Sequence, residues 1–131
     1  INYILNRFKE IDTIMLGRSL LRCPSLLQND ESEEELRQRF LSFYLEIIDE
    51  HYKLIGANST LFYMKELWFY FKDYFINSLR DYQNLIKIKD YLSFKNYSIN
   101  LIKTLRLNLY PKITLIRMWT QKFTFFFINN F

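Results

Sequence analysis

The sequence predicts a mainly α-helical chain whose central part is an antiparallel bundle, and three observations support this. Half of the 131 residues are apolar and 19% are aromatic, which is ample material for a packed core. Only two Gly and two Pro occur, too few for the turns of a β-sandwich or β-barrel. Between residues 32 and 105 the apolar positions recur at helical spacing, as expected for helices that bury one face.

Residues 1–28 follow a different pattern, which favours a βα unit. A helical segment over residues 1–10 precedes the apolar residues 13–16, and these end at Gly17. Such a short apolar stretch suits a strand buried between two layers, and Arg18 then opens a second helix that stops near Pro24. This order is typical of a parallel α/β sheet or barrel. One strand cannot form a sheet, so we expect its partner strands upstream, in a longer protein.

Residues 29–105 are expected to form the bundle, beginning after a polar break at residues 29–31. Ser32 and Glu35 form a capping box at the start of a long helix that should stop at Gly56. A second, largely apolar helix should run to about Ile76. A third is expected over residues 79–92, and a fourth, capped by Ser93, to Leu105. The residues expected to face the core are Leu36, Phe40, Tyr44, Ile47, Ile48, His51, Ile55, Leu61, Met64, Trp68, Phe71, Phe75, Tyr82, Leu85, Ile86, Leu92, Phe94, Tyr97, Leu101, Ile102 and Leu105.

The tail, residues 106–131, has no amphipathic period and contains the aggregation-prone stretch 124–131. We expect it to be an atypical addition, such as translation past a frameshift would produce. Elsewhere, the single Cys23 excludes an internal disulfide and a multi-Cys metal site. Neither a signal peptide nor a stretch of about 20 apolar residues is visible, so a cytoplasmic monomer without a membrane segment is expected.

Charge is distributed unevenly along the chain. Residues 29–52 hold eight acids against two bases, whereas residues 60–105 hold seven bases against four acids. The tail from residue 106 adds four bases and no acid. An anionic partner should therefore dock on the second half of the chain, although a charge excess this small can also be an ordinary solvated surface.

Gly17 and Arg18 are the first candidate site. A Gly at the end of a strand allows a ligand to approach the backbone closely, and the following helix offers free N–H groups to a phosphate. The Arg18 guanidinium adds donors whose geometry matches phosphate oxygens. On the dipeptide alone, an ordinary tight turn with a surface Arg is the simpler explanation.

The longer pattern carries a family resemblance. Asp12-x-Ile-Met-Leu-Gly-Arg-Ser-Leu-Leu-x-x-Pro24-x-Leu26 resembles the last strand and helix of flavin-dependent α/β barrels, in reductases of the old yellow enzyme type and in tRNA-dihydrouridine synthases. The helices that follow, with Met64-Lys-Glu-Leu-Trp-Phe-Tyr70 and Leu79-Arg-Asp-Tyr82, look like the helical C-terminal domain of the synthases. Ser19 and Leu20 depart from the Gly or Ala that often follows the Arg.

The resemblance implies a function in which uridine in tRNA is reduced by FMN that NADPH recharges. The chain would hold the C-terminal remnant of the TIM barrel, residues 1–28, and the tRNA-binding domain, residues 29–105. Gly17 and Arg18 would bind the FMN phosphate, and Lys65, Arg80 and Lys87 would contact tRNA phosphates. The catalytic Cys of the family lies on an upstream loop, so no catalytic residue is expected here and this part alone should be inactive.

Other residues have simpler interpretations. Cys23 is expected to be a small buried side chain, His51 a partly buried hydrogen-bonded one, and Trp68 part of the bundle core rather than a base-stacking platform. The acids of residues 30–35 are explained by a helix start, and no metal site is expected. Two alternatives remain open: a helical protein-interaction module without a nucleic-acid partner, and a piece of another flavin-barrel reductase.

Overall fold

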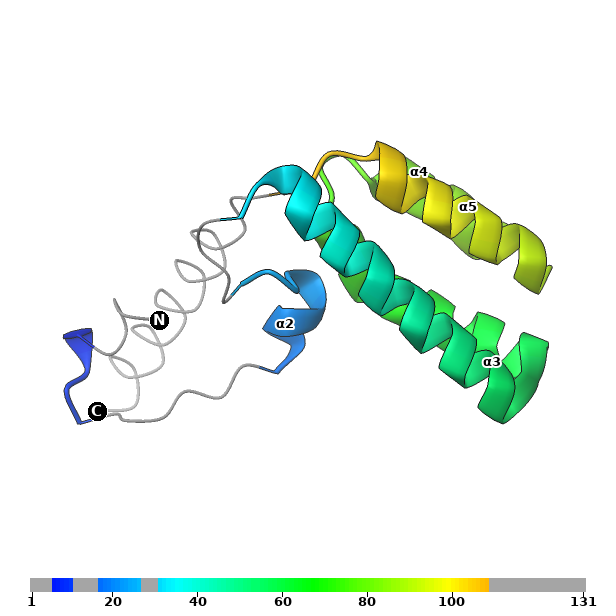
Figure 1. The fold of residues 1–131 in the computed structure, drawn as a ribbon, viewed down its shortest axis with the longest axis horizontal. Coiled ribbons are helices and arrows are strands. Elements are labelled where there is room, and N and C mark those ends of the chain that lie inside the picture. Colours follow the sequence, from blue (N-terminus) through cyan, green and yellow to red (C-terminus); the bar gives the residue numbers. More distant parts are fainter. Residues whose placement is uncertain (1–5, 11–16, 27–30, 109–131) are drawn as a thin grey trace, which may run out of the picture.

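The computed structural model describes residues 6–10, 17–26 and 31–108, and within these residues the chain is helical (Figure 1). The predicted strand at residues 13–16 and the tail beyond residue 108 lie outside the described residues. The helices and the 3₁₀ turn are α2 (Arg18–Arg22), α3 (Glu33–Phe71), η1 (Lys72–Tyr74), α4 (Leu79–Lys87) and α5 (Tyr91–Thr104).

The first turn of α3 is fixed by the predicted capping box. The Ser32 hydroxyl oxygen accepts from the Glu35 amide at 3.3 Å, and a Glu35 carboxylate oxygen accepts from the Ser32 amide at 2.8 Å. Two amides that the helix cannot satisfy itself are thereby paired. Three acids, Glu33, Glu34 and Glu35, occupy this first turn, which suits the positive end of the helix dipole. The interpretation of the acidic cluster as a helix start is confirmed.

Gly56 divides α3 into the two helices that the sequence predicts. Its φ of 76° and ψ of 177° are not helical, and the chain reverses there. The Tyr44 hydroxyl then meets the Trp68 indole at 3.1 Å, and His51 stacks on Tyr63 with ring centroids 4.1 Å apart. These pairings run antiparallel, and Figure 1 shows the two halves of α3 lying side by side.

Gly56→Ala is expected to lower the free energy of unfolding by about 1–2 kcal/mol, because a Cβ is disfavoured at positive φ. A Cβ at this position would meet no atom within 4 Å, so the cost comes from the backbone and not from a clash. Gly17→Ala is the matched control, since Gly17 has equal space and a φ of −86°. Urea denaturation of both variants measures the difference, and equal midpoints would contradict this role for Gly56.

The other two helices complete the bundle. The Lys65 ammonium meets the Ile88 carbonyl and the Lys72 ammonium lies over the Tyr82 ring, so α4 runs antiparallel to the second half of α3. On the other side, α5 runs antiparallel to the first half, where the Lys95 ammonium contacts Asp49 at 2.5 Å. Each half of α3 therefore has its own partner helix.

The predicted boundary between the last two helices was wrong. The third helix ends at Lys87 instead of residue 92, and the residue that caps the fourth is Asp90 instead of Ser93. The Asp90 carboxylate accepts from the Ser93 amide at 2.8 Å, which starts α5 three residues earlier than expected. Leu92 consequently lies in the first turn of α5 and is 62% exposed, so its assignment to the core was also wrong. Ile55, at the hairpin tip, is likewise exposed.

Two capping carboxylates predict an acid sensitivity. Hydrogen bonds from the Ser32 amide and then its hydroxyl lower the pKa of Glu35 below its ordinary 4.5. Bonds from the Ser93 amide and hydroxyl likewise lower the pKa of Asp90 below 3.8. As the pH falls, these two carboxylates are protonated in the unfolded chain at a higher pH than in the folded chain. Their contribution to stability is therefore present above their ordinary pKa values and is lost as the pH falls below them.

The urea midpoint should accordingly fall as the pH drops from about 5 to about 3. Asp90→Asn is the control, because Asn caps a helix about as well as Asp but does not titrate. This variant should lose less stability in acid than the wild type. An identical acid profile for both chains would exclude Asp90 as a contributor.

The core lies along the hairpin and extends to α5. Its fully buried large side chains are Trp68, Tyr44, Tyr74, Phe71, Phe94, Ile48, Met64, Leu85 and Ile102. A chain of hydrogen bonds crosses it: the Trp68 indole donates to the Tyr44 hydroxyl, which donates to the Ser98 hydroxyl at 2.7 Å. Burial raises the pKa of Tyr44 to about 12, so the phenol stays neutral. Trp68 as a core residue is confirmed.

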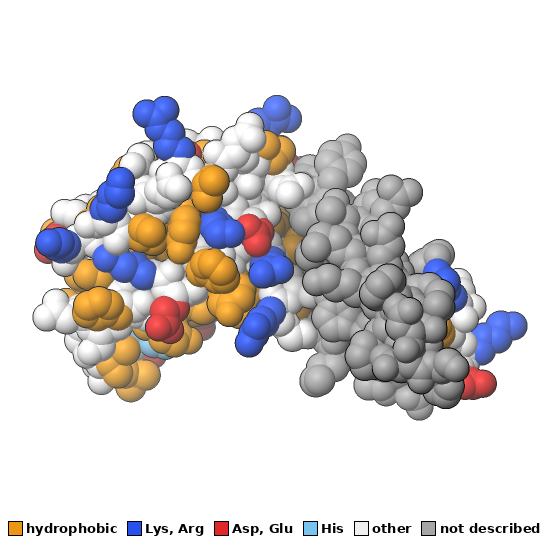
Figure 2. Space-filling view, turned by 180° about the vertical axis from the view of Figure 1, so that it is seen from behind, with side chains coloured by type: hydrophobic (Ala, Val, Ile, Leu, Met, Phe, Trp, Pro, Cys, Tyr) orange, Lys and Arg blue, Asp and Glu red, His pale blue; other side chains and the backbone are white. Residues whose placement is uncertain are grey.

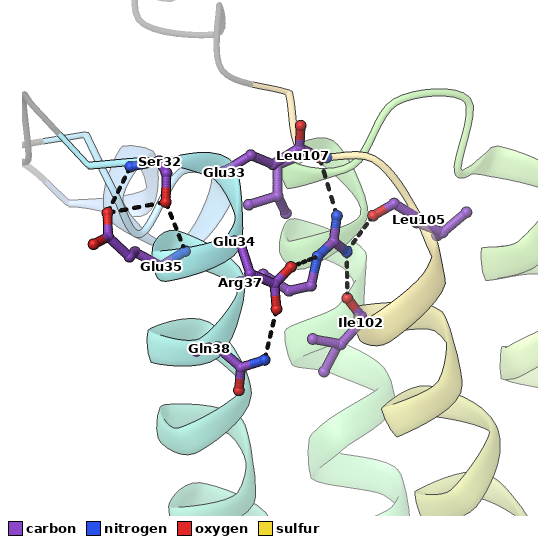
Figure 3. Close-up of polar contacts among 9 residues, drawn as sticks. All are labelled: Ser32, Glu33, Glu34, Glu35, Arg37, Gln38, Ile102, Leu105 and Leu107. Carbon is purple, nitrogen blue, oxygen red and sulfur yellow. Dashed lines mark hydrogen bonds and ion pairs between the residues drawn. The ribbon is translucent and has the colours of Figure 1, made fainter.

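A polar network closes the end of the bundle where α3 begins and α5 ends (Figure 3). The Arg37 guanidinium donates to the Ile102 carbonyl at 2.7 Å and to the Leu105 carbonyl, both at the C-terminal end of α5. It also pairs with Glu33 at 3.0 Å, and Glu33 accepts from the Leu107 amide at 2.9 Å. A guanidinium suits the helix end because carbonyls there lack intrahelical donors.

The chain stays attached to the bundle beyond residue 105. Leu107 is buried and forms an isolated antiparallel bridge with Phe75. The Ile76 amide donates to the Arg106 carbonyl at 2.9 Å, and the Asn108 amide donates to the Tyr74 carbonyl at 2.8 Å. Residues 106–108 therefore pack with the helical domain, whereas the sequence places them in the tail.

Helix α2 packs on the upper part of α3 and on η1 (Figure 1). The thiol of Cys23 is buried within the same apolar cluster as the bundle core, which confirms it as a small buried side chain. Arg22 pairs with Asp73 of η1 at 3.3 Å. Residues 18–26 thus share a core with the bundle instead of forming a separate body next to it.

Candidate nucleic-acid interface

Four basic side chains of interest belong to the second half of α3, to the η1 turn that follows it, and to α4, which contacts α3. Lys65 and Lys72 come from α3 and η1, two helical turns apart, and Arg80 and Lys87 are separated by the same interval on α4. The predicted tRNA-contacting residues Lys65, Arg80 and Lys87 thus belong to two helices that contact each other.

Lys65 is only partly free for a ligand. Its ammonium donates to the Ile88 carbonyl at 2.5 Å, at the C-terminal end of α4, and its side chain is half-buried. The positive charge compensates the negative end of the α4 dipole and holds α4 against α3. Lys65 is thus a structural residue first, and a substitution there would disturb the position of α4 as well as any phosphate contact.

Lys72 lies between two aromatic rings. Its ammonium is 5.1 Å from the centroid of the Phe69 ring and 5.9 Å from that of Tyr82, distances at which a cation is attracted to the ring face. It also pairs with Asp73 at 2.8 Å. The charge is therefore held beside the exposed Phe69 ring.

Arg80 and Lys87 are the most accessible cations of this group. Both are exposed on α4, and within the described ranges 17–26 and 31–108 neither forms an ion pair. They face away from Leu85, which α4 buries against the bundle. Side chains of this kind can meet phosphate oxygens without breaking an internal contact.

Most acids of the bundle belong to the first half of α3. Glu33, Glu34, Glu46, Asp49 and Glu50 all belong to the first half of α3, which packs against α5 rather than α4. Several are already paired, for example Asp49 with Lys95 at 2.5 Å. Since α5 adds Lys95 and Lys103 to this half, and Glu66, Asp73 and Asp81 accompany the cations of the other half, folding evens out most of the charge asymmetry of the sequence.

Large apolar side chains are also exposed in the part of the chain that carries these Lys and Arg residues. This was not predicted from the sequence. Phe62 is 68% exposed and Phe69 49%, and they lie seven residues apart on one face of α3. Ile76 and Leu79, which follow in the chain, are also exposed. Figure 2, seen from behind the view of Figure 1, shows hydrophobic and basic side chains interspersed on one face of the molecule. Residues seven positions apart share a helix face whether that face is buried or exposed. Spacing alone therefore does not separate exposed residues such as Phe62 and Phe69 from core residues.

The predicted phosphate site at Gly17 and Arg18 lies at the start of α2. Gly17 is the residue before α2, both residues are exposed, and a Cβ on Gly17 would meet no atom within 4 Å. Open space beside a backbone amide and an accessible guanidinium fit a phosphate group. The Gly17–Arg18 corner lies at α2, and α2 packs on α3 and η1 rather than on α4.

The remaining candidates have structural roles. The Nδ1 of His51 lies 2.9 Å from the Ile47 carbonyl, which only accepts, so Nδ1 carries the proton and the interpretation of a hydrogen-bonded, partly buried His is confirmed. Among the described residues, no three His, Cys, Asp or Glu side chains are placed to hold a metal ion. None of the described helices has the length and hydropathy needed to cross a bilayer.

Comparison of the chain with protein-family models, with curated proteins and with solved structures gives no match.

Proposed function

We propose that this chain is the C-terminal part of an FMN-dependent tRNA-dihydrouridine synthase and that its helical bundle binds tRNA. The observation that carries the RNA-binding part is the gathering of Lys72, Arg80 and Lys87 on the second half of the bundle, apart from the acidic first half of α3. The enzymatic part is supported by the sequence resemblance alone.

In this proposal the exposed cations neutralise RNA phosphates and set the position of the tRNA without reading its sequence. Arg80 and Lys87 contribute most, because the α4 helix presents them freely. Lys65 contributes mainly by fixing α4 through the Ile88 carbonyl. The affinity should therefore decrease as salt displaces the RNA.

Gly17 and Arg18 fit the phosphate group of FMN. When bound, FMN would supply the hydride for uridine reduction through its flavin ring. The Gly17 amide and the Arg18 guanidinium would hold that phosphate, and α2 joins the corner to the bundle through its contacts with α3. This arrangement would connect cofactor and RNA sites through one packed core. NADPH would recharge the flavin.

The test is a mobility-shift titration of the full chain with unmodified tRNA at low and at moderate salt. We expect binding that weakens with salt, and we expect Arg80→Ala/Lys87→Ala to lower the slope of log affinity against log salt by up to about two. The control Lys53→Ala/Lys103→Ala removes the same charge from the first half of α3 and from α5. Absence of binding at low salt, or equal effects of both double variants, would contradict the proposal.

A second candidate is a helical module that docks on another protein, and the exposed apolar side chains favour it. Phe62, Phe69 and Leu79 are all exposed near one another in the sequence, and apolar surface of this kind is common at protein interfaces. In that case Phe69→Asp should abolish the interaction, while Arg80→Ala/Lys87→Ala should have little effect. The same variants in the tRNA titration discriminate the two candidates.

A further inference from the structure

Phe62 and Phe69, two exposed phenylalanines in the second half of α3, lie along a line that Lys65 and Lys72 border on one side. Phe62 and Phe69 point in nearly the same direction, because seven residues are close to two full helical turns. Their positions are about 10 Å apart along the axis, at about 1.5 Å per residue. Lys65 and Lys72 lie on the α4 side of this line, and we call Phe62, Lys65, Phe69 and Lys72 the aromatic stripe.

Burial separates these rings from the core aromatics. Trp68, next to Phe69, is 1% exposed and holds its indole hydrogen bond inside, whereas Phe69 leaves half of its surface in water. The ammonium of Lys72 stands 5.1 Å from the Phe69 ring centroid. This ammonium lies over one face of the Phe69 ring, so the base of a nucleotide would stack on the other face.

Two acids border the opposite side of the stripe. Asp73 is neutralised by Lys72 at 2.8 Å and by Arg22 at 3.3 Å, whereas Glu66 is exposed. The exposed bases Arg80 and Lys87 of α4 lie beyond the other border. Because α4 carries one acid, Asp81, against these two cations, a polyanion would lie across the rings on the α4 side.

We propose that the aromatic stripe binds unpaired nucleotides of RNA by stacking bases on Phe69 and Phe62. This inference rests on the proposed RNA-binding function and deepens it, because it names single-stranded RNA rather than duplex as the partner of this surface. Stacking is tolerant of sequence, since every base has a π face. In duplex RNA the faces of the nucleobases are covered by their neighbours. A duplex would therefore contact only the basic side chains of α4.

The test compares the full chain with an oligouridylate and with a blunt RNA duplex carrying the same number of phosphates. Phe69→Leu should weaken oligouridylate binding roughly tenfold and leave duplex binding unchanged, because Leu keeps the apolar surface but lacks a π face. Phe69→Tyr should bind as the wild type does. Leu54→Ala, an exposed apolar change at the hairpin tip, is the control and should change neither affinity.

A second reporter does not depend on a loss of binding. Phe69→Trp adds an exposed indole to the two Trp of the chain, and oligouridylate should quench its fluorescence beyond the wild-type change. Equal affinities of wild type and Phe69→Leu for oligouridylate, parallel losses on both RNAs, or no added quenching would overturn stacking. Binding of tRNA and duplex without oligouridylate would overturn stacking alone, whereas failure of every RNA to bind would overturn the proposed function with it.

Discussion

Trp68→Ala is expected to destabilise the chain by about 3–5 kcal/mol, the range observed for truncating a buried aromatic residue. Trp68 is 1% exposed, stacks on Phe75 with centroids 5.9 Å apart and meets Tyr44 and Phe71 edge-on. The substitution opens a cavity at the centre of the hairpin and removes the donor to the Tyr44 hydroxyl. For a domain whose total stability is about 5–15 kcal/mol, much of the folded population would be lost on mild heating.

Urea denaturation followed by helical circular dichroism measures this effect. Phe69→Ala is the matched control, because it removes the neighbouring aromatic side chain from a half-exposed position and should cost under about 1 kcal/mol. Tyr44→Phe should fall between the two, at about 1–3 kcal/mol, since it leaves the Trp68 indole N–H without its partner. Similar losses for Trp68→Ala and Phe69→Ala would show that the packing of the hairpin differs from that described.

Arg37→Ala is expected to lower the free energy of unfolding by about 2–3 kcal/mol, as expected for charge-assisted hydrogen bonds at a partly buried site. The Arg37 side chain is only 11% exposed and joins the start of α3 to the end of α5 (Figure 3). Without it, the Ile102 and Leu105 carbonyls lose a donor, and Glu33 loses a countercharge.

Arg39→Ala is the control for this network. Arg39 lies on α3, as Arg37 does, and pairs with Glu31 at 3.0 Å. Because the Arg39 side chain is 63% exposed, this pair should contribute about 0–1 kcal/mol to stability. High salt should reduce the effect of Arg39→Ala more than that of Arg37→Ala, because dissolved ions screen an exposed pair more than a partly buried one. Equal urea midpoints for both variants would show that the Arg37 network does not stabilise this end of the bundle.

Local signals in the sequence were sufficient for much of the fold. The capping box of Ser32 and Glu35 and the stop at Gly56 depend on neighbours in the chain, so both could be predicted and both are confirmed. Helical spacing likewise identified Tyr44, Trp68 and Phe94 as core. The start of α5 was missed because Asp90 and Ser93 both suit an N-cap, and only the geometry selects Asp90.

Long-range contacts were beyond the sequence. The role of Lys65 depends on the Ile88 carbonyl, 23 residues away, and the network of Arg37 reaches residues more than 60 positions along the chain. Nothing local indicates which carbonyl a cation will meet. For the same reason, the exposed positions of Phe62 and Phe69 could not be separated from the core aromatics by hydropathy alone.

The structure describes the residues of the proposed tRNA site but only part of the segment expected to form the FMN site. Arg80 and Lys87 are accessible on α4, and the Lys72 ammonium lies over the exposed Phe69 ring. Arg18 opens α2 as predicted, and the strand expected before Gly17 lies outside the described residues. The shared core of α2 and the bundle, through Cys23, is new information about how the two parts are joined.

The most direct measurement is hydrogen exchange of the full chain with and without unmodified tRNA at low salt. We predict added protection in α4 (Leu79–Lys87) and in residues 60–76, with little change over residues 33–52, where the acids repel RNA. Protection confined to the acidic half of α3, or no change anywhere while tRNA is bound, would contradict RNA binding by the basic half of the bundle.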